Sequence, residues 1–269
     1  YSCNMQCFVR VHMKYKDIQI VSPKKIYRTN ELPISDYLQT FQQGLLDDFM
    51  KGYKEIQEVA DLEKSLNRDD ISKDLLEYMV RTEDHSNPNA WLAAGFKYTN
   101  DFREQYFTRE DEGWKEKYPT AFRLMDELGD DCPILNYSAI APRSKINRHN
   151  GIENITGQFI RIHIPLIIPE GEVFLEVAGE KVYWKDGIFG FNNQWIHSAH
   201  NKSDEWRLIF LVDVDRERAG LEPGVAYNSE VYKVTEDFED PDAGLEHTWN
   251  NFAYGDEALE KVTGAGKKT

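Results

Sequence analysis

The spacing of apolar and polar positions changes at about residue 129. Upstream, from residue 30 to 128, the chain is expected to be mostly helical: DYLQTFQQGLLDDFMKGYKEI carries apolar residues at helical spacing after a start signal at Ser35-Asp36. DDISKDLLEYMV and PTAFRLMDEL predict shorter helices, the second opening on Pro119. Between them lies a segment of mixed signals, in which a core role is favoured over a substrate groove for the aromatic residues Trp91, Phe96, Tyr98, Phe102 and Tyr106.

From residue 129 to 216 the pattern becomes that of a β protein. Short apolar or alternating runs are separated by Pro, Gly, Asn and Asp: ILNYSAIAP, GQFIRIHIPLIIP, EVFLEVAGE, KVYWKD, GIFGF and WRLIFLVDVD. Many short strands with frequent turns predict a sandwich or barrel, with a jelly roll among the possibilities. Residues 217–269 form an acidic extension with little apolar periodicity, and no repeat or linker divides the chain, so we expect a single domain over residues 1–269.

Charge and cysteine content narrow the class of protein. The chain has a net charge of −15, which argues against nucleic acid or an anionic membrane as the main partner. The three cysteines form neither a disulfide framework nor a zinc motif, which favours a reducing compartment. The apolar runs are too short to span a bilayer, so a soluble, cytoplasmic protein is expected, with its oligomeric state left open.

The β half contains the residues that carry chemistry: Ser138, His149, the pair Arg161 and His163, His197, and Arg207. Arg161 and His163 are two residues apart in an apolar strand and therefore share one face. A buried guanidinium needs either an internal carboxylate or a bound anion, and the sequence leaves both open for Arg161. Imidazoles on separate strands suit iron, zinc, copper or nickel. The residues alone thus predict a metal or anion site inside a β barrel.

Four stretches together resemble the aspartyl/asparaginyl β-hydroxylase family: NYSAIAPRSKINRHNG, RIHIPLIIPEG, the turn Trp184-x-x-Gly187, and WIHSAHNKSDEWRLIFLVDVD. Ser138 stands eleven residues before His149, and His197 ten before Arg207, as in the family pattern. The resemblance extends from about residue 114 to 216. It implies a mainly β fold, a double-stranded β-helix with N-terminal helices packed on it, and a dioxygenase that uses Fe(II), 2-oxoglutarate and O₂.

Carried over by residue, the resemblance implies Fe(II) ligation by His149 and His197, with no protein side chain needed as an acid or base. It further implies 2-oxoglutarate binding, with Arg207 and Ser138 on the distal carboxylate and Arg161 and His163 on the barrel wall. This chain departs from the facial triad that is usual in other oxygenases, because the position two after His149 is Gly151, as in some members of the family it resembles. A two-histidine site is therefore expected, and Glu153 would reach the metal only if its loop folded back.

A second departure concerns the segment before the second histidine, where Asn192 and Asn193 stand in place of the family's acidic residue. That difference affects how the ligands are oriented rather than the metal itself. His200, three residues after His197, is expected at an exposed strand edge.

The expected reaction is hydroxylation of an unactivated C–H bond, most directly in an Asp or Asn residue of a peptide or protein. The same chemistry on a free amino acid or a natural-product intermediate is an alternative. A basic patch could meet an anionic substrate or form a solvated loop: Arg143, Lys145 and Arg148. Two other classes stay open, a metal-dependent cupin enzyme of different chemistry and a non-catalytic barrel that binds a small anion through Arg161 and Arg207. The first would have no use for the Arg207 clamp, and the second would not depend on either histidine.

Overall fold

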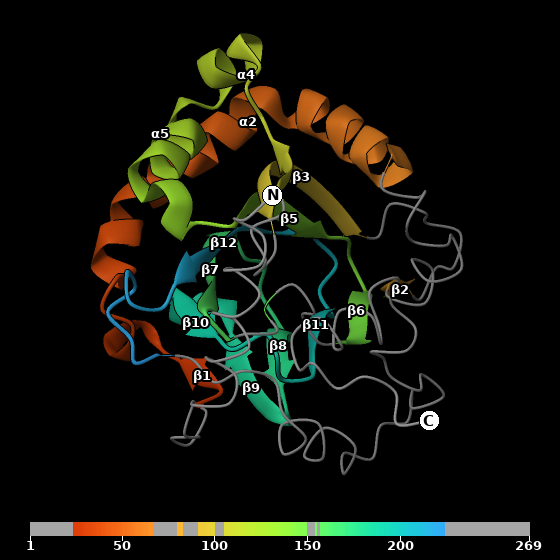
Figure 1. Cartoon of the computed structure of the whole chain (residues 1–269). Coiled ribbons are helices and arrows are strands. Elements are labelled where there is room, and N and C mark those ends of the chain that lie inside the picture. The colour runs from red at the N-terminus through yellow and green to blue at the C-terminus, as the bar shows by residue number, and fades with distance from the viewer. Residues whose placement is uncertain are drawn as a thin grey trace, which may run out of the picture.

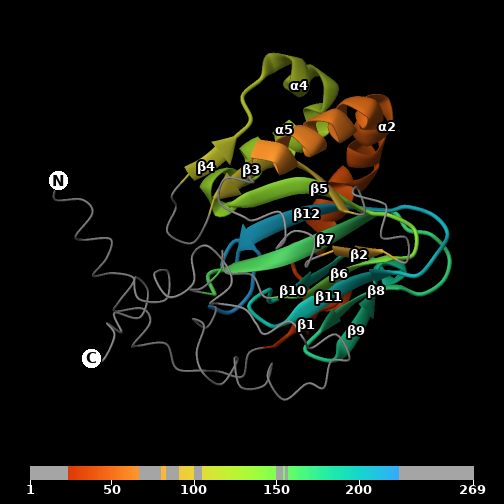
Figure 2. The same cartoon turned by 90° about the vertical axis from the view of Figure 1, so that its right-hand side faces the viewer.

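The structure is a computed structural model that describes residues 24–66, 80–82, 91–99, 105–149, 154 and 157–223. Two antiparallel sheets face each other, and helices cover the outer side of one of them (Figures 1 and 2). The elements are β1 (Ile26–Tyr27), η1 (Thr29–Glu31), α2 (Ser35–Leu66), β2 (Val80–Thr82), β3 (Trp91–Thr99), β4 (Gln105–Thr108), α4 (Glu112–Lys117), α5 (Pro119–Leu128), η3 (Gly129–Asp131), β5 (Ile134–Ile140), β6 (Ser144–His149), β7 (Phe159–Ile167), β8 (Val173–Val177), β9 (Glu180–Tyr183), η5 (Trp184–Asp186), β10 (Phe189–Phe191), β11 (His197–Asn201) and β12 (Arg207–Asp215).

The strand order confirms the predicted double-stranded β-helix. In the first sheet the order β10-β7-β12-β5 forms one wall of the barrel, and in the second the order β6-β11-β8-β9 forms the other. Along the chain the strands cross from one wall to the other, except for the β8–β9 hairpin, and every pairing is antiparallel. Strands β1, β3 and β4 extend the first sheet at its edges, and β2 extends the second.

Alternation along β12 separates two apolar cores. Leu208, Phe210 and Val212 point outward and pack under the helices, in the core that also includes Phe41, Leu45 and Phe122. Their neighbours Ile209 and Leu211 point into the barrel, where they pack with Trp184, Phe189 and Phe191. The first sheet is therefore buried on both faces, and any polar residue on its inner face lies in the barrel.

Helices α2 and α5 lie across the outer face of the first sheet (Figure 2). Buried tyrosine hydroxyls fasten them, since Tyr137 donates to Leu45 O at 2.8 Å and Tyr118 donates to Gly52 O at 3.0 Å. The close approach requires glycine at residue 52, because a Cβ there would lie 1.9 Å from the Tyr118 hydroxyl. None of the helices in the described ranges is long and apolar enough to cross a membrane.

The helical region differs from expectation in one respect. Helix α2 begins at Ser35 and α5 at Pro119, as the start signals indicate. The interval between these helices also contains strands, however, because β3 pairs along the whole edge of β5 and enlarges the barrel wall. The helix expected in DDISKDLLEYMV falls outside the described residues except for Val80, which begins β2.

The aromatic residues between the helices divide among several environments. Phe96 is fully buried in the core beneath the helices, as predicted, and Tyr98 is 41% exposed. Trp91 turns toward the barrel instead and contacts Ser138. Phe102 and the side chain of Tyr106 lie outside the described residues, as do Cys3, Cys7 and the C-terminal extension beyond residue 223.

Candidate functional site

Two histidines that are far apart in the sequence meet on the inner face of the second sheet. His149 is the last residue of β6, His197 is the first of β11, and the antiparallel register places them opposite each other. Their ring centroids are 4.3 Å apart with an interplanar angle of 53°. A register shift follows between His197 and Ala199, so that both His149 and the apolar Ile146 face the barrel interior. The predicted ligand pair is therefore brought together.

His197 is held in the protonation state that a metal ligand requires. Its Nδ1 lies 2.8 Å from Trp195 O, and because a carbonyl only accepts, Nδ1 carries the proton and Nε2 keeps its lone pair. Burial, reinforced by the neighbouring His149, holds the pKa of His197 well below its usual range. The imidazole is consequently neutral at physiological pH, which is the form that binds a metal.

Arg207 is a buried cation whose charge is not matched by an ion pair. It is 1% exposed; NH1 donates to Ser138 O at 3.0 Å, and the guanidinium carbon lies 4.6 Å from the Trp184 ring centroid. Its Nε has no hydrogen-bond partner, and none of the described carboxylates forms a salt bridge with it. Burial lowers the pKa of Arg207 to about 9, so the side chain is still charged at neutral pH. An unpartnered donor on a buried guanidinium fits a bound anion.

Ser138 lies next to Arg207 and offers a second hydrogen-bond donor for the same ligand. It lies on β5 opposite Ile209 of β12 and is 4% exposed. Its Oγ accepts a hydrogen bond from Trp91 Nε1 at 3.1 Å, which leaves the hydroxyl proton available for an acceptor. The serine and the arginine that the family pattern assigns to one carboxylate are therefore adjacent.

His163 lies on the inner face of β7, on the same face as Arg161, as the spacing predicts. It is 4% exposed, with Phe189 and Phe191 packed edge-on against its ring. Burial holds the pKa of His163 well below its usual range, and the positive charges of Arg207 and Arg161 lower it further. His163 is thus a neutral polar group within the barrel.

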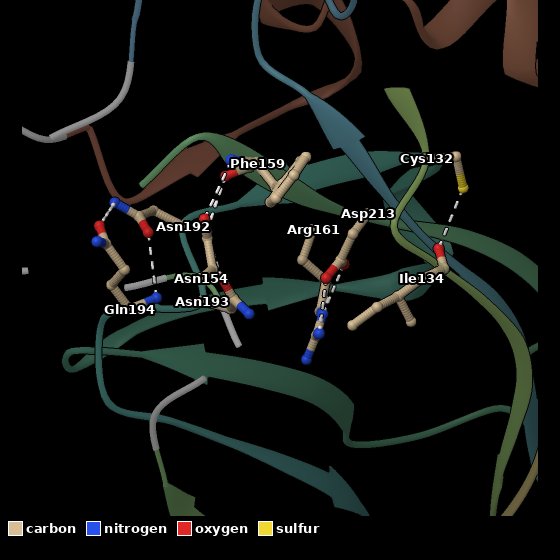
Figure 3. A network of polar contacts seen from close by, with 9 residues as sticks. All are labelled: Cys132, Ile134, Asn154, Phe159, Arg161, Asn192, Asn193, Gln194 and Asp213. Atoms are coloured by element: carbon tan, nitrogen blue, oxygen red, sulfur yellow. Dashed lines mark hydrogen bonds and ion pairs between the residues drawn. The ribbon is translucent and has the colours of Figure 1, made fainter. Parts of the chain in front are cut away.

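For Arg161, the structure provides the internal carboxylate that was one of the two open possibilities. Asp213 stands opposite it in the register of β7 and β12, and two bonds of 2.8 Å join Nε to Oδ1 and NH2 to Oδ2 (Figure 3). The side chains are 11% and 2% exposed. Burial of Arg161 therefore does not by itself require a dianion, and its contact with a cosubstrate stays a prediction.

Amide side chains bind the segment after His149 to the segment before His197 (Figure 3). Asn154 Nδ2 donates to Asn193 Oδ1 at 2.8 Å and to Phe159 O at 2.9 Å, while Phe159 N donates to Asn154 Oδ1 at 3.0 Å. Asn193 is fully buried, so the position that is acidic in the family pattern is occupied here by a neutral group within a network of amides.

Two of the three predicted basic residues do not approach the histidine pair. Arg143 lies in the turn that precedes β6, at the other end of that strand from His149, and forms a 2.6 Å ion pair with Asp204. Lys145 is opposite His200 on the outer face of the second sheet. The length of β6 separates both residues from His149, and the register shift before His149 leaves Lys145 on the other face of the sheet. The structure therefore does not bring these two residues to the histidine pair, and their contact with a substrate stays a prediction.

Arg148 is half-buried and directly precedes His149, so it is the member of the patch that stays near the site. His200 is half-buried, not exposed, and stacks on Phe174 with centroids 4.6 Å apart, on the face of the sheet opposite to His197. Gly151 and Glu153 lie outside the described residues.

Asp213 and Asn154 were not assigned a role from the sequence, while Trp91 was expected in the core and Trp184 was noted only as part of a turn in the family resemblance. Asp213 could have been found, because it is six residues after Arg207 in one strand and so shares its inner face. The contacts of Trp91 and Trp184 with site residues gave no such signal, since an aromatic residue in a strand-rich pattern is indistinguishable from core. In the described part of the chain no group of three or more His, Cys, Asp or Glu is placed to hold a metal, so a metal here would take two protein ligands from it.

Comparison with known proteins identifies the family of this chain. The family model described as aspartyl/asparaginyl beta-hydroxylase matches residues 53–217. The aspartyl/asparaginyl beta-hydroxylases of Homo sapiens and Mus musculus are each 30% identical to this chain over 81 residues, which is 30% of this chain and 10% of the relative. The aligned part thus spans about a tenth of those relatives.

A crystal structure of an oxidoreductase of the 2OG-Fe(II) oxygenase family from Burkholderia pseudomallei is 10% identical, with a TM-score of 0.33, over 51% of this chain and 71% of that one. That likeness is too distant to carry an argument, and the fold assignment rests on the strand order. The match to the family model covers more than half of the residues, and the chain belongs to the aspartyl/asparaginyl β-hydroxylase family.

Proposed function

We propose that this protein is an Fe(II)- and 2-oxoglutarate-dependent dioxygenase that hydroxylates an Asp or Asn residue in a peptide or protein. Family membership supports the reaction class. The single observation that supports 2-oxoglutarate as the cosubstrate is the burial of Arg207 in the barrel without a balancing charge. Its Nε has no partner, and none of the described carboxylates forms an ion pair with it. A dicarboxylate is the kind of ligand that would complete it.

His149 and His197 would hold the iron. The two rings face each other, His197 is neutral, and its Nδ1 proton is fixed on a carbonyl, so the donor set fits a divalent metal that prefers imidazole. When bound, Fe(II) supplies the redox chemistry that couples oxidative decarboxylation of 2-oxoglutarate to C–H hydroxylation by O₂. The balance is R–H, O₂ and 2-oxoglutarate in, and R–OH, succinate and CO₂ out, with one oxygen atom of O₂ in each of R–OH and succinate.

The remaining residues bind and orient the cosubstrate. Arg207 would present two N–H groups to the distal carboxylate, and the Ser138 hydroxyl would donate a third hydrogen bond. His163 and Arg161 would contact it from the barrel wall. The apolar side chains that surround these groups, among them Ile209, exclude water and so strengthen each polar contact. None of these residues needs to gain or lose a proton during the reaction.

The substrate assignment rests on the family, and the same chemistry on a free amino acid is the alternative. Arg148, next to His149, is the candidate for contact with an anionic substrate. Its contribution can be separated from that of the cosubstrate residues, because loss of a substrate contact changes the KM for the substrate and leaves the affinity for 2-oxoglutarate unchanged.

The test is succinate formation from 2-oxoglutarate, dependent on Fe(II) and O₂, with Asp- and Asn-containing peptides, free amino acids and small acids as prospective substrates. His197→Ala should abolish both metal binding and succinate formation. The matched control is His200→Ala, which removes a histidine three residues away on the opposite face and should leave both intact. Unchanged turnover in His197→Ala would contradict the proposal. Binding of 2-oxoglutarate that needs neither histidine nor metal, without turnover, would instead indicate an anion-binding barrel.

A further inference from the structure

Trp184 lies inside the barrel in contact with His163 and Arg207, and the proposed function gives it no role. It begins the short turn η5 after β9 and is fully buried among the side chains that fill the barrel. Gly187 ends the turn with φ 109°, a conformation that L side chains rarely adopt, and a Cβ there would lie 3.0 Å from Thr29 Oγ1. The turn therefore fixes the direction in which the indole enters the barrel.

The indole N–H determines which tautomer His163 adopts. Trp184 Nε1 lies 3.1 Å from His163 Nδ1, and an indole nitrogen can only donate. Nδ1 of His163 must therefore accept, and a neutral imidazole that accepts at Nδ1 carries its proton on Nε2. His163 is consequently a hydrogen-bond donor at Nε2. The opposite tautomer would place a lone pair at that position.

The same indole supports Arg207. The guanidinium carbon lies 4.6 Å from the Trp184 ring centroid, while Ser138 O accepts from NH1 at the edge of the same group. The contact with the indole ring and the hydrogen bond at one edge restrict the position of the guanidinium, and its Nε has no partner. Trp184 therefore touches both His163 and Arg207, which approach the site from different strands.

We propose that Trp184 is a positioning residue for the cosubstrate: its N–H keeps His163 in the Nε2–H form, and its ring holds the plane of Arg207. The inference rests on the proposed function, since it takes the ligand to be a dicarboxylate. A carboxylate only accepts hydrogen bonds, so it is recognised by donors alone. Without the Trp184 N–H, His163 would also populate the tautomer that repels a carboxylate.

The experiment removes the N–H and keeps the ring. Benzothienylalanine, the sulfur isostere of tryptophan, is incorporated at residue 184, and Trp184→Phe serves as a second, fully encoded variant. Long-range ¹H–¹⁵N spectra of the metal-free protein report which ring nitrogen of His163 is protonated, with His163→Gln to assign the signals. Binding of 2-oxoglutarate is titrated calorimetrically with Mn(II) present and oxygen excluded. Thermal unfolding confirms that each variant is folded.

In the wild type we expect the proton of His163 on Nε2. The isostere should move most of the His163 proton to Nδ1. With only about a tenth of the protein in the Nε2–H form, the affinity for 2-oxoglutarate should be weaker by about tenfold. In the His163→Gln background the isostere should change the affinity by less than about twofold, because the interaction it removes is already gone. Trp184→Phe should weaken binding at least as much, because it also narrows the surface beneath Arg207.

A proton on Nδ1 of wild-type His163, or a tautomer unchanged by the isostere, would overturn the inference. So would an altered tautomer with unaltered affinity for 2-oxoglutarate. If the wild type binds no 2-oxoglutarate, the proposed function fails together with the role toward that ligand. The spectra of His163 would still decide whether Trp184 sets its tautomer, so the two failures are distinguishable.

Discussion

Replacing Arg207 by methionine should leave the ligand-free protein at least as stable as the wild type. Structural arginines buried in a protein normally have a carboxylate partner, and removing them leaves that partner unpaired and is strongly destabilising. Arg207 has no such partner among the described residues. Burial of its charge instead costs free energy that one hydrogen bond and the contact with the Trp184 ring offset, and methionine of similar length would fill the same space without that cost.

The magnitude follows from the surroundings of Arg207. A pKa lowered from 12.5 to about 9 corresponds to about 5 kcal/mol of unfavourable free energy for the charged form. The hydrogen bond to Ser138 O offsets about 1.5–3 kcal/mol, and the contact with the Trp184 ring offsets about 2 kcal/mol. The net contribution of the charged Arg207 side chain to the stability of the ligand-free protein is therefore near zero or unfavourable. We therefore expect Arg207→Met to change the free energy of unfolding by between about 0 and +2 kcal/mol.

The assay is urea denaturation of both proteins, without ligand and with 2-oxoglutarate and Mn(II). Wild type should gain about 2.7 kcal/mol at a ligand concentration one hundred times its Kd, and Arg207→Met should gain none at that concentration. The matched control is Arg216→Met. Arg216 is 7% exposed, but its donors are bound to Glu222 O at 2.8 Å and Tyr27 Oη at 2.7 Å, so its loss should cost about 2–3 kcal/mol.

The reasoning would be refuted if Arg207→Met lost 3 kcal/mol or more, roughly the cost of breaking a buried ion pair. It would also be refuted if the variant kept the stabilisation by 2-oxoglutarate.

Three further outcomes follow from the packing and the charges. The pKa values of His163 and His197 are below that of an unfolded histidine, so below about pH 6.5 the unfolded chain takes up protons that the folded chain does not. The free energy of unfolding should therefore fall by up to about 2.7 kcal/mol for each pH unit below that value. A urea midpoint that does not change over that pH unit would contradict the buried neutral state of the two histidines. Asn193→Leu should lower the free energy of unfolding by about 1–3 kcal/mol, because it leaves Asn154 without one partner; an unchanged value would show that the amide network contributes nothing. Gly52→Ala should lower the free energy of unfolding by about 1–3 kcal/mol, because the new methyl group overlaps the Tyr118 hydroxyl, and Tyr118→Phe should recover part of that loss. Strictly additive effects of the two substitutions would show that the two side chains are not in contact.

The barrel was predictable because its signals are local. The short continuous apolar run in RLIFLVDVD and the turn residues between the runs identify strands, and a run that is apolar at consecutive positions indicates a sheet covered on both faces. Strand β3 was harder to predict, since WLAAGFKYT combines small helix-forming residues with aromatics, and its pairing with β5 decides its structure.

The site residues were predictable only where their spacing in the sequence matches the family pattern. The distances in the sequence between Ser138 and His149 and between His197 and Arg207 are part of the resemblance. The barrel then places His149 opposite His197, and Ser138 beside Arg207. Contacts between facing strands depend on their register, so the sequence can place Asp213 on the inner face but does not show which residue it contacts. The partner of Arg161 is more than fifty residues later, at Asp213.

The predicted position of the basic residues next to the histidine pair differs from the structure for a related reason. Arg143 and Lys145 are close to His149 in sequence, but an extended strand of about 3.3 Å per residue separates them from it. Nearness along a strand does not predict a shared site, whereas nearness across a sheet does. The same geometry places His200 on the opposite face from His197 despite their spacing of three.

The central claim is that this barrel uses O₂ and 2-oxoglutarate to oxidise a substrate. Its most direct test is turnover of an Asp- or Asn-containing peptide under oxygen-18 gas with Fe(II) and 2-oxoglutarate, followed by mass spectrometry of both products. We predict one labelled oxygen atom in succinate, one in the hydroxylated residue, and neither product in Arg207→Met at the same 2-oxoglutarate concentration. Succinate without label, or a product formed equally well without 2-oxoglutarate, would contradict the account.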